Sequence, residues 1–357
     1  MKTIHDFEAY RCGPQTTIRE VLARIDASPH LFQIVVDEAG RLLGTVTDGD
    51  IRRAMLQGAG LDEPASRCMQ REPTVGRVGE TVENQARLAN LGSSRPFLPV
   101  VDENRIVRHI FVGGDGTGIL TAVVMAGGPG TRLGERTRNT PKPLLPVGGR
   151  PILDHILGAL ESNGVRRVMI SVHYLASQIE SFVAERSSTA EIEIIHEPNR
   201  LGTAGILGML GDRTPREPFL VMNGDVLTKA DLTALHEFHN RHRLDGTVVV
   251  ARYEVDVPFG VVRYGADGLF AGIEEKPRIS NYVAAGVYLL SPEFVGLVSR
   301  GRPLDMPELL NLGRDIGLRI GLFPIHEYWT DIGRPDDLEA ADVVHRAPGT
   351  AGRGKGA

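Results

Sequence analysis

LTAVVMAGGPGTRLGERTRNTPKPLLPVGGRPIL, residues 120–153, joins a short apolar run to a segment rich in glycine, proline and cations. The apolar run predicts a buried strand, and the glycines after it predict an exposed loop because they cannot form a helix interior. Glycine N–H groups can approach an anion closely, and arginine offers donors that suit phosphate oxygens. The segment therefore predicts a phosphate-binding loop at the carboxyl edge of an α/β sheet.

The spacing of this loop excludes two known phosphate-binding motifs. A P-loop has Lys-Ser or Lys-Thr directly after its last glycine, and this loop has neither. The dinucleotide fingerprint has two residues before its third glycine, whereas three residues separate Gly130 from Gly134. Lys142, between Pro141 and Pro143, lies on a stiff segment that can direct its ammonium group toward the same phosphates.

The sequence downstream of the loop alternates between apolar strands and amphipathic helices. One helix is expected between Pro151 and Asn163, and strands are expected at RRVMISVH, EIEIIH, PFLVMN and GTVVVAR. The alternation predicts an α/β fold over residues 117–346, with a doubly wound, mostly parallel, Rossmann-like sheet. Residues 347–357 have no apolar pattern and are expected to be a disordered tail.

The N-terminal third contains an internal duplication. VVDEAGRLLGTV (35–46) and VVDENRIVRHI (100–110) each predict two strands joined by a tight turn, and a helical pattern precedes each copy. The repeated unit is therefore expected to be helix, strand, strand, helix, forming a small α+β domain over residues 1–116. The glycine-rich stretch 113–118 predicts the linker to the following domain.

Length, charge and cysteine content narrow the class of protein. A chain of 357 residues predicts two domains, and a net charge of -5 gives no electrostatic reason to expect nucleic acid. Two cysteines are too few for a disulfide framework, and we find no apolar run long enough to span a bilayer. These features predict a cytoplasmic protein without a membrane partner.

HEFHNRH, residues 236–242, is a second cluster of chemically active side chains. Its spacing misses that of the zinc protease motif, and its histidines spread around a helix instead of sharing one face. We interpret it as a solvated helix face.

GGPGTRL followed by PKPLLPVGGRPIL resembles the signature of the sugar-phosphate nucleotidylyltransferases. Further motifs of that family follow in the expected order, namely EPNRLGTAGIL, VMNGDV, IEEKP, AAGVYLL and WTDIGRPDDL, and together they cover nearly all of residues 119–340. The resemblance implies an enzyme that joins a nucleoside triphosphate to a sugar 1-phosphate and releases pyrophosphate.

The resemblance also implies a role for each matching residue. The expected nucleotide-binding residues are Gly127, Gly128, Gly130, Thr131, Glu197 and Gly202. The expected sugar-phosphate residues are Glu275, Lys276 and Gly286. The cations expected to act in catalysis by neutralising phosphate charge are Arg132, Lys142 and Lys276. Asp225 and Asp331 are the expected ligands of a Mg²⁺ cofactor.

The base and the sugar are harder to derive. A carboxylate at Glu197 suits the donors of guanine, so GTP is favoured, with UTP or dTTP as the alternative. Many relatives have asparagine where this chain has Ala284, which leaves mannose, heptose and glucosamine 1-phosphates open. A nucleotide-binding regulator without catalysis is a further alternative, although all five expected cationic and acidic residues are present.

The duplicated unit resembles a tandem CBS pair, a module that binds adenine nucleotides in many proteins. Thr47 and Asp50 match the contacts of the first copy, whereas the second copy is expected to have Phe111 and Gly114 instead. The resemblance implies an adenine-nucleotide effector, or a structural or dimer-forming role in a homo-oligomer. A CBS pair ahead of such an enzyme resembles glucosamine-1-phosphate guanylyltransferases, which favours glucosamine 1-phosphate.

Overall fold

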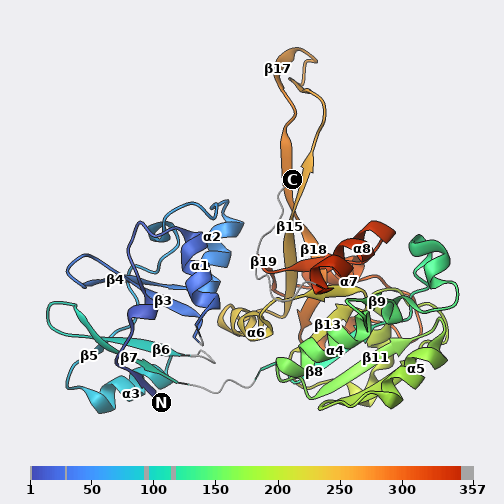
Figure 1. Cartoon of the computed structure of the whole chain (residues 1–357), viewed down its shortest axis with the longest axis horizontal. Helices are drawn as coiled ribbons and strands as arrows, with labels where there is room; N and C mark the ends of the chain where they lie inside the picture. The colour runs from blue at the N-terminus through green and yellow to red at the C-terminus, as the bar shows by residue number, and fades with distance from the viewer. Residues whose placement is uncertain (1, 29, 92–95, 114–117, 347–357) are drawn as a thin grey trace.

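The computed structural model describes residues 2–28, 30–91, 96–113 and 118–346. Figure 1 shows two bodies, a smaller one in blue and cyan and a larger one in green to red. We call residues 2–113 the front domain and residues 118–346 the large domain. The expected tail over 347–357 lies outside the described residues, as does most of the expected linker.

The front domain contains two small sheets with the strand orders β2-β3-β4 and β1-β7-β6-β5. Its strands are β1 (Lys2–Ile4), β2 (Arg11–Cys12), β3 (Phe32–Val36), β4 (Leu42–Thr47), β5 (Gly76–Arg77), β6 (Phe97–Val101) and β7 (Val107–Val112). Its α-helices are α1 (Ile18–Asp26), α2 (Asp48–Leu56) and α3 (Thr81–Ala89). Thr17 and Glu20 form a capping box that starts α1, and the expected apolar stripe of this helix is buried.

The two hairpins of the front domain fold in the same register. Phe32 pairs with Thr47 in the first, and Phe97 pairs with Val112 in the second. Both hairpins also have a register shift at the Val-Val pair. The two turns have equal length, so Thr47 of the first copy corresponds to Val112 of the second. The expected correspondence of Thr47 with Phe111 is therefore wrong by one residue. The counterpart of Asp50 is accordingly not Gly114, and it falls among residues outside the described part.

The second copy differs from the first after its hairpin. Helix α2 follows β4 directly, but within the described residues no helix lies between β7 and β8 (Thr121–Met125). The closing helix expected for the second copy is therefore not seen among the described residues, and residues 114–117 lie outside them. A glycine-rich sequence follows β7, and glycine has a low helix propensity.

The large domain is built on a sheet whose seven described strands have the order β12-β11-β8-β13-β18-β15-β19. Only β18 is antiparallel to its neighbours. The other six strands are β8, β11 (Arg167–Val172), β12 (Glu191–His196), β13 (Phe219–Asn223), β15 (Gly246–Asp256) and β19 (Ile320–Ile325), and β18 is Arg278–Leu290. The expected doubly wound, mostly parallel α/β fold is confirmed.

Helices cover both faces of this sheet. One core joins α4 (Ile152–Ser162), α5 (Ala176–Glu185), α6 (Leu232–Arg241) and α8 (Pro335–Arg346) to one face, and a second core joins α7 (Met306–Asp315) to the other. Helix α4 has Pro151 and Asn163 as its caps, as expected. Of the helices in the described ranges, none has the length and apolar character needed to cross a membrane.

Three two-stranded sheets complete the large domain: β9 (Pro146–Val147) with β10 (Arg150–Pro151), β14 (Val226–Thr228) with β20 (Trp329–Asp331), and β16 (Val261–Tyr264) with β17 (Phe270–Glu274). Strands β15 and β18 extend together beyond the sheet, and β16 and β17 form the end of this projecting hairpin (Figure 1). The hairpin thus carries its tip away from both domain bodies.

The front domain contacts the large domain through α2, which packs against α6 and β19. This contact changes the interpretation of HEFHNRH, which lies on and just beyond α6. His239 is buried, with Nδ1 2.9 Å from Oγ1 of Thr247, and Nε2 of His242 lies 3.1 Å from Nη1 of Arg53 in α2. The expected solvated face is therefore wrong for these two histidines, because β15 and the front domain cover them.

Candidate active site

The glycine-rich loop lies at the carboxyl end of β8, beside the carboxyl end of β13. The chain leaves β8 toward β11 on one side and later returns to β13 on the other, which makes this the topological switch point of the sheet. A cavity of about 290 Å³ opens here. The loops after β8, β12 and β13 supply most of its walls. Open α/β sheets bind ligands at this position, so the cavity is the candidate active site.

The loop needs glycine for its own geometry as well as for access. Gly130 has a φ of +64°, and a Cβ there would lie 2.9 Å from the side chain of Thr137. A Cβ on Gly128 would meet nothing within 4 Å, whereas one on Gly127 would lie 3.1 Å from Oε1 of Glu197. Four of the expected residues of this loop line the cavity: Gly128, Gly130, Thr131 and Arg132.

Three cations border the cavity: Arg132, Lys142 and Arg200. Lys142 is buried, and its ammonium group forms an ion pair with Asp225. Arg132 and Arg200 make no hydrogen bond or ion pair within the part of the chain that the structure describes. Their donors are therefore available to phosphate oxygens.

Asp225 and Asp331 lie side by side although more than a hundred residues separate them. Asp225 immediately precedes β14 and Asp331 ends β20, and these strands pair so that Val226 lies opposite Asp331. Ile332 N donates to the carbonyl oxygen of Asp225 at 3.0 Å. Burial raises the pKa of Asp331, and the nearby charge of Asp225 raises it further.

The two carboxylates fit the expected Mg²⁺. Oδ1 of Asp225 and Oδ1 of Asp331 are both buried without a hydrogen-bond partner among the described residues. Buried acceptor oxygens without donors suit a hard divalent cation, which takes its remaining ligands from phosphates and water. Within the described ranges no cluster of three or more histidine, cysteine or acidic side chains could hold a metal, so this pair is the candidate site.

Glu197 is buried next to the glycine loop. Its Oε2 accepts a hydrogen bond from Leu201 N at 3.0 Å, and its Oε1 faces Gly127. The carboxylate therefore holds the start of the LGTAG segment and keeps one oxygen toward the loop. Gly202 has a φ of +74°, and a Cβ there would lie 2.6 Å from Oδ1 of Asp305. Position 202 therefore requires glycine, because it packs against the segment before α7.

The expected sugar-phosphate residues are not all in one place. Glu275 and Lys276 are exposed between β17 and β18, and neither lines the cavity. After a register shift between Val248 and Val250, β15 and β18 stay paired as far as Asp256 and carry this motif beyond the sheet, on the projecting hairpin that Figure 1 shows. Gly286 remains in the sheet, where a Cβ would lie 2.7 Å from Nδ2 of Asn223. The structure does not bring Lys276 together with Arg132 and Lys142.

Three polar residues at the site were missed by sequence reasoning. Arg200 and Thr203 line the cavity, and Oδ1 of Asn223 is buried without a hydrogen-bond partner among the described residues. Arg200 could have been found, since a cation beside a glycine turn is the signal that identified Arg132. The orphaned oxygen of Asn223 depends on tertiary packing and leaves no signal in the sequence.

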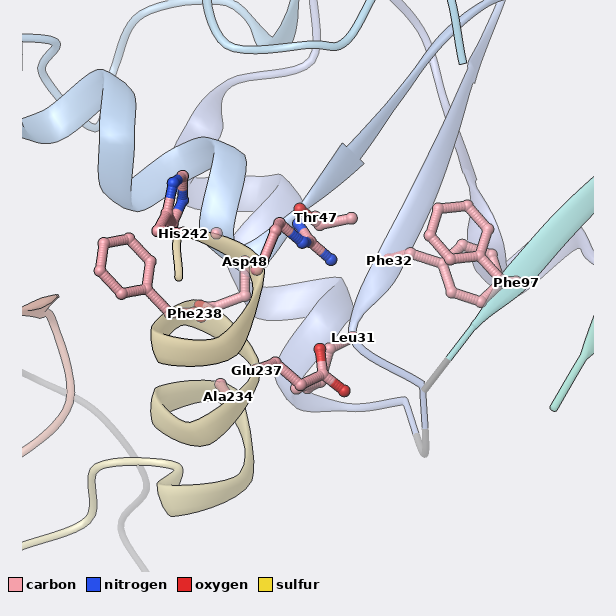
Figure 2. Close-up of a pocket in the computed structure, with 11 residues that line it drawn as sticks. Leu31, Phe32, Thr47, Asp48, Phe97, Ala234, Glu237, Phe238 and His242 are labelled. Atoms are coloured by element: carbon pink, nitrogen blue, oxygen red, sulfur yellow. The ribbon is translucent and has the colours of Figure 1, made fainter. Parts of the chain in front are cut away.

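Thr47 and Asp50 are the candidate nucleotide contacts of the front domain; Thr47 is the N-cap of α2, and Asp50 lies in its first turn. Their side chains bond to each other, since Thr47 Oγ1 donates to Asp50 Oδ2 at 2.6 Å, and Arg53 pairs with the other Asp50 oxygen. Figure 2 shows the adjoining cavity, which Phe238 and His242 of the large domain close on one side. This cavity measures about 30 Å³, room for about one water molecule and not for a nucleotide.

Comparison with known families gives two matches. The family described as nucleotidyl transferase matches residues 121–345, and the CBS domain family matches residues 5–57. The CBS match covers only the first of the two copies in the front domain.

Curated relatives resemble the large domain. Mannose-1-phosphate guanylyltransferase catalytic subunit beta of Drosophila pseudoobscura pseudoobscura is 34% identical over 231 residues, covering 63% of this chain and 61% of that protein. Mannose-1-phosphate guanylyltransferase of Mycobacterium tuberculosis is 32% identical over 244 residues, covering 65% and 67%. The chain spans about three fifths of the length of the first of these relatives.

Solved structures show the same fold. HddC from Yersinia pseudotuberculosis is 25% identical, with a TM-score of 0.51 over 63% of this chain and 99% of that chain. The same protein has been solved in complex with GMP-PN, and that structure, 24% identical with a TM-score of 0.51, shares the fold over 63% of this chain and 99% of that chain.

Proposed function

Because the chain belongs to the nucleotidyl transferase family, we propose that it transfers a guanylyl group from GTP to a sugar 1-phosphate, with mannose 1-phosphate as the preferred sugar. The observation that carries the proposal is that Arg132, Lys142 and Asp225 line one cavity at the sheet switch point, with Asp331 beside Asp225. Sequence reasoning favoured glucosamine 1-phosphate, but the names of the relatives favour mannose 1-phosphate instead.

In the proposed reaction an oxygen of the sugar phosphate attacks the α-phosphorus of GTP. A new bond forms between this oxygen and the α-phosphorus. The bond between the α-phosphorus and the oxygen that bridges it to the β-phosphate breaks, and pyrophosphate leaves with the electron pair. The N–H groups of the glycine loop would hold the triphosphate, and Arg132 and Arg200 would offset its charge. Lys142, fixed between prolines at the cavity wall, would stabilise charge on the attacked phosphate.

Asp225 and Asp331 would hold Mg²⁺, which when bound supplies positive charge to the phosphate oxygens and aligns them. The protein itself provides no covalent nucleophile in this scheme. Its residues bind the two anionic substrates, orient them and offset their repulsion, which are the main sources of rate in phosphoryl-type transfers.

The proposed recognition of guanine rests on Glu197. A carboxylate only accepts hydrogen bonds, and Oε1 is left after Oε2 binds Leu201 N. Oε1 would pair with the N1–H and the 2-amino group of guanine. Glu197→Gln preserves an acceptor for Leu201 N while adding an amide donor, so it separates base recognition from loop structure. We expect this variant to lose preference for GTP and to gain turnover of UTP.

Pyrophosphate release with Mg²⁺ tests the activity, using each of GTP, UTP, dTTP, CTP and ATP with mannose, glucosamine and heptose 1-phosphates. We expect turnover with GTP and mannose 1-phosphate, and a fall of at least about 100-fold in kcat for Asp331→Asn. Asp336→Asn is the matched control, since Asp336 is exposed in the first turn of α8 and should leave kcat unchanged. Equal turnover of UTP or dTTP would exclude the assignment of guanine, and no turnover with any pair would favour a non-catalytic nucleotide binder.

For the front domain we propose a CBS-type pair spanning residues 1–116, whose second half diverges. The match over residues 5–57 and the shared register of the two hairpins support this assignment. An adenine nucleotide at Thr47 and Asp50 would need α2 to separate from α6, because the cavity there is too small. Calorimetric titration with AMP and ATP tests whether the front domain binds an adenine nucleotide. If millimolar nucleotide gives no heat of binding, a structural role is left for the front domain.

A further inference from the structure

Arg52 of the front domain is completely buried although it carries a permanent charge. Its Nε lies 2.5 Å from Oδ2 of Asp48, one turn earlier in α2, and its Nη2 lies 2.8 Å from Oε1 of Glu327 in the large domain. Nη1 donates to the carbonyl oxygen of Pro324, and the guanidinium carbon lies 3.9 Å from the ring centroid of Phe323. Apart from Asp48, the hydrogen bonds and the ring contact just described all belong to the large domain, while Asp26 of α1 adds a nearby acidic charge.

These contacts all fall on one short segment that leads to the candidate metal site. Phe323 and Pro324 lie in β19, and Glu327 lies between β19 and β20. Strand β20 ends at Asp331, four residues after Glu327. Arg52 therefore binds the segment that directly precedes Asp331, a proposed metal ligand.

Other anchors of the same segment come from within the large domain. Lys229 N donates to the carbonyl of Tyr328 at 2.9 Å, and the indole N–H of Trp329 donates to the carbonyl of Ala285 at 2.8 Å. These bonds and the β14–β20 ladder fix β20 against its neighbours. The connection between β19 and β20 is held by Arg52 through both a backbone carbonyl and a side chain.

A buried ion network of this kind is weak as a source of stability, because desolvation of the charges offsets most of their attraction. It does define geometry, since the planar guanidinium reaches three acceptors in fixed directions. Burial raises the pKa of Glu327, but Arg52 and its neighbours outweigh that effect and lower the pKa to about 2. Glu327 is thus a carboxylate under ordinary conditions and depends on Arg52 for its charge partner.

We propose that Arg52 is a positioning residue for the metal site: through Pro324 and Glu327 it fixes the segment that places Asp331 beside Asp225. The proposal rests on the proposed function only in taking these two aspartates as metal ligands. The front domain is then part of the machinery that sets metal affinity.

Mn²⁺ binding to the full chain tests the proposal, with free Mn²⁺ counted by electron paramagnetic resonance in the absence of substrate. Arg52→Met retains an apolar stem over Phe323 and removes the guanidinium. We expect it to raise the Mn²⁺ dissociation constant by on the order of 10-fold, a typical effect of losing a residue that orients a metal ligand. Glu327→Gln, which keeps the shape and changes only the charge, should raise it less, and it decides the test if Arg52→Met does not fold.

The matched control is Arg186→Met. Arg186 is a half-buried arginine that, like Arg52, pairs with two carboxylates, Asp154 at 2.8 Å and Glu161 at 2.7 Å, away from β20. It should lower stability and leave Mn²⁺ affinity unchanged. Wild-type affinity in folded Arg52→Met, an equal loss in Arg186→Met, or a wild-type chain that binds no Mn²⁺ would each overturn the proposal.

Pyrophosphate release is measured in parallel on the same proteins, and it separates the two proposals. A wild-type chain that binds Mn²⁺ but releases no pyrophosphate would exclude the proposed reaction and leave the Mn²⁺ comparison intact. In an active enzyme, Arg52→Met should raise the Mg²⁺ concentration needed for half-maximal rate, and saturating Mg²⁺ should restore most of kcat.

Discussion

The two copies in the front domain contain similar hairpins, but the chain after each hairpin is different. Both have a Val-Val pair at a register shift, a tight turn after it and the same strand pairing. The first copy continues into α2, which places Arg52 against the large domain, whereas the second runs into a glycine-rich stretch and has no such helix among the described residues. Duplication thus repeated a local structure, and a few residues after it decided which copy contacts the other domain.

The largest expected difference between the two copies is in how much their arginine ion pairs contribute to stability. Arg52→Ala removes the guanidinium from the buried carboxylates of Asp48 and Glu327, so we expect the free energy of unfolding to fall by about 3–5 kcal/mol. Arg108→Ala removes the exposed pair with Asp102 in the second copy and should cost less than about 1 kcal/mol. Urea denaturation measures both, and equal losses would contradict the comparison.

The pH dependence of stability should also separate the copies. The folded pKa of Glu327 is lowered from 4.5 to about 2, so its contribution is complete above the unfolded value and is lost as pH falls through the folded one. The stability advantage of wild type over Glu327→Gln should therefore shrink between about pH 5 and pH 2. Asp102→Asn in the second copy is the comparison. Burial raises the pKa of Asp102, but hydrogen bonds from Ile106 N and Arg108 outweigh it and lower that pKa, so the advantage over Asp102→Asn should shrink in the same direction and by less. An advantage of wild type over Glu327→Gln that does not change with pH would contradict the assignment.

The smallest difference concerns the turns of the two hairpins. Gly40 has a φ of +78° and its counterpart Arg105 has a φ of +60°, so both adopt the left-handed conformation. Gly40→Ala should cost about 1 kcal/mol for conformation alone, because the nearest atom to an added Cβ is 3.9 Å away. Arg105→Gly should change stability by less than about 0.5 kcal/mol, since relief of strain is offset by a more flexible unfolded chain. A larger loss for Arg105→Gly, measured by thermal unfolding, would show that its side chain has a role of its own.

Much of the fold could be read from local patterns. The apolar run before Gly127, the helix between Pro151 and Asn163 and the repeated Val-Val turns each depend on periodicity or on turn chemistry, and the structure has all of them. The register of the second hairpin was missed by one residue, because turn length cannot be fixed from composition. The helix expected after the second hairpin is not seen among the described residues. That expectation extended the repeat past the residues that support it.

The candidate site was only partly predictable. The glycine loop, Arg132 and Lys142 are close in sequence, and their grouping in one cavity agrees with the motif. Lys276 belongs to the same set of motifs but lies on the projecting hairpin, because the pairing of β15 with β18 beyond the sheet decides where that motif goes. Arg200 was overlooked although it directly precedes the LGTAG segment.

The sequence by itself determined the α/β alternation, the phosphate-binding loop and the duplication, because each is encoded by neighbouring residues. Tertiary structure alone decided that Asp225 meets Asp331, and that Arg52 meets Glu327 from 275 positions away in the chain. Such contacts depend on the packing of whole elements, such as α2 on α6 and β19, and no local pattern records them. Burial then changes the chemistry of these groups, because a charge removed from water depends on the few groups that pair with it.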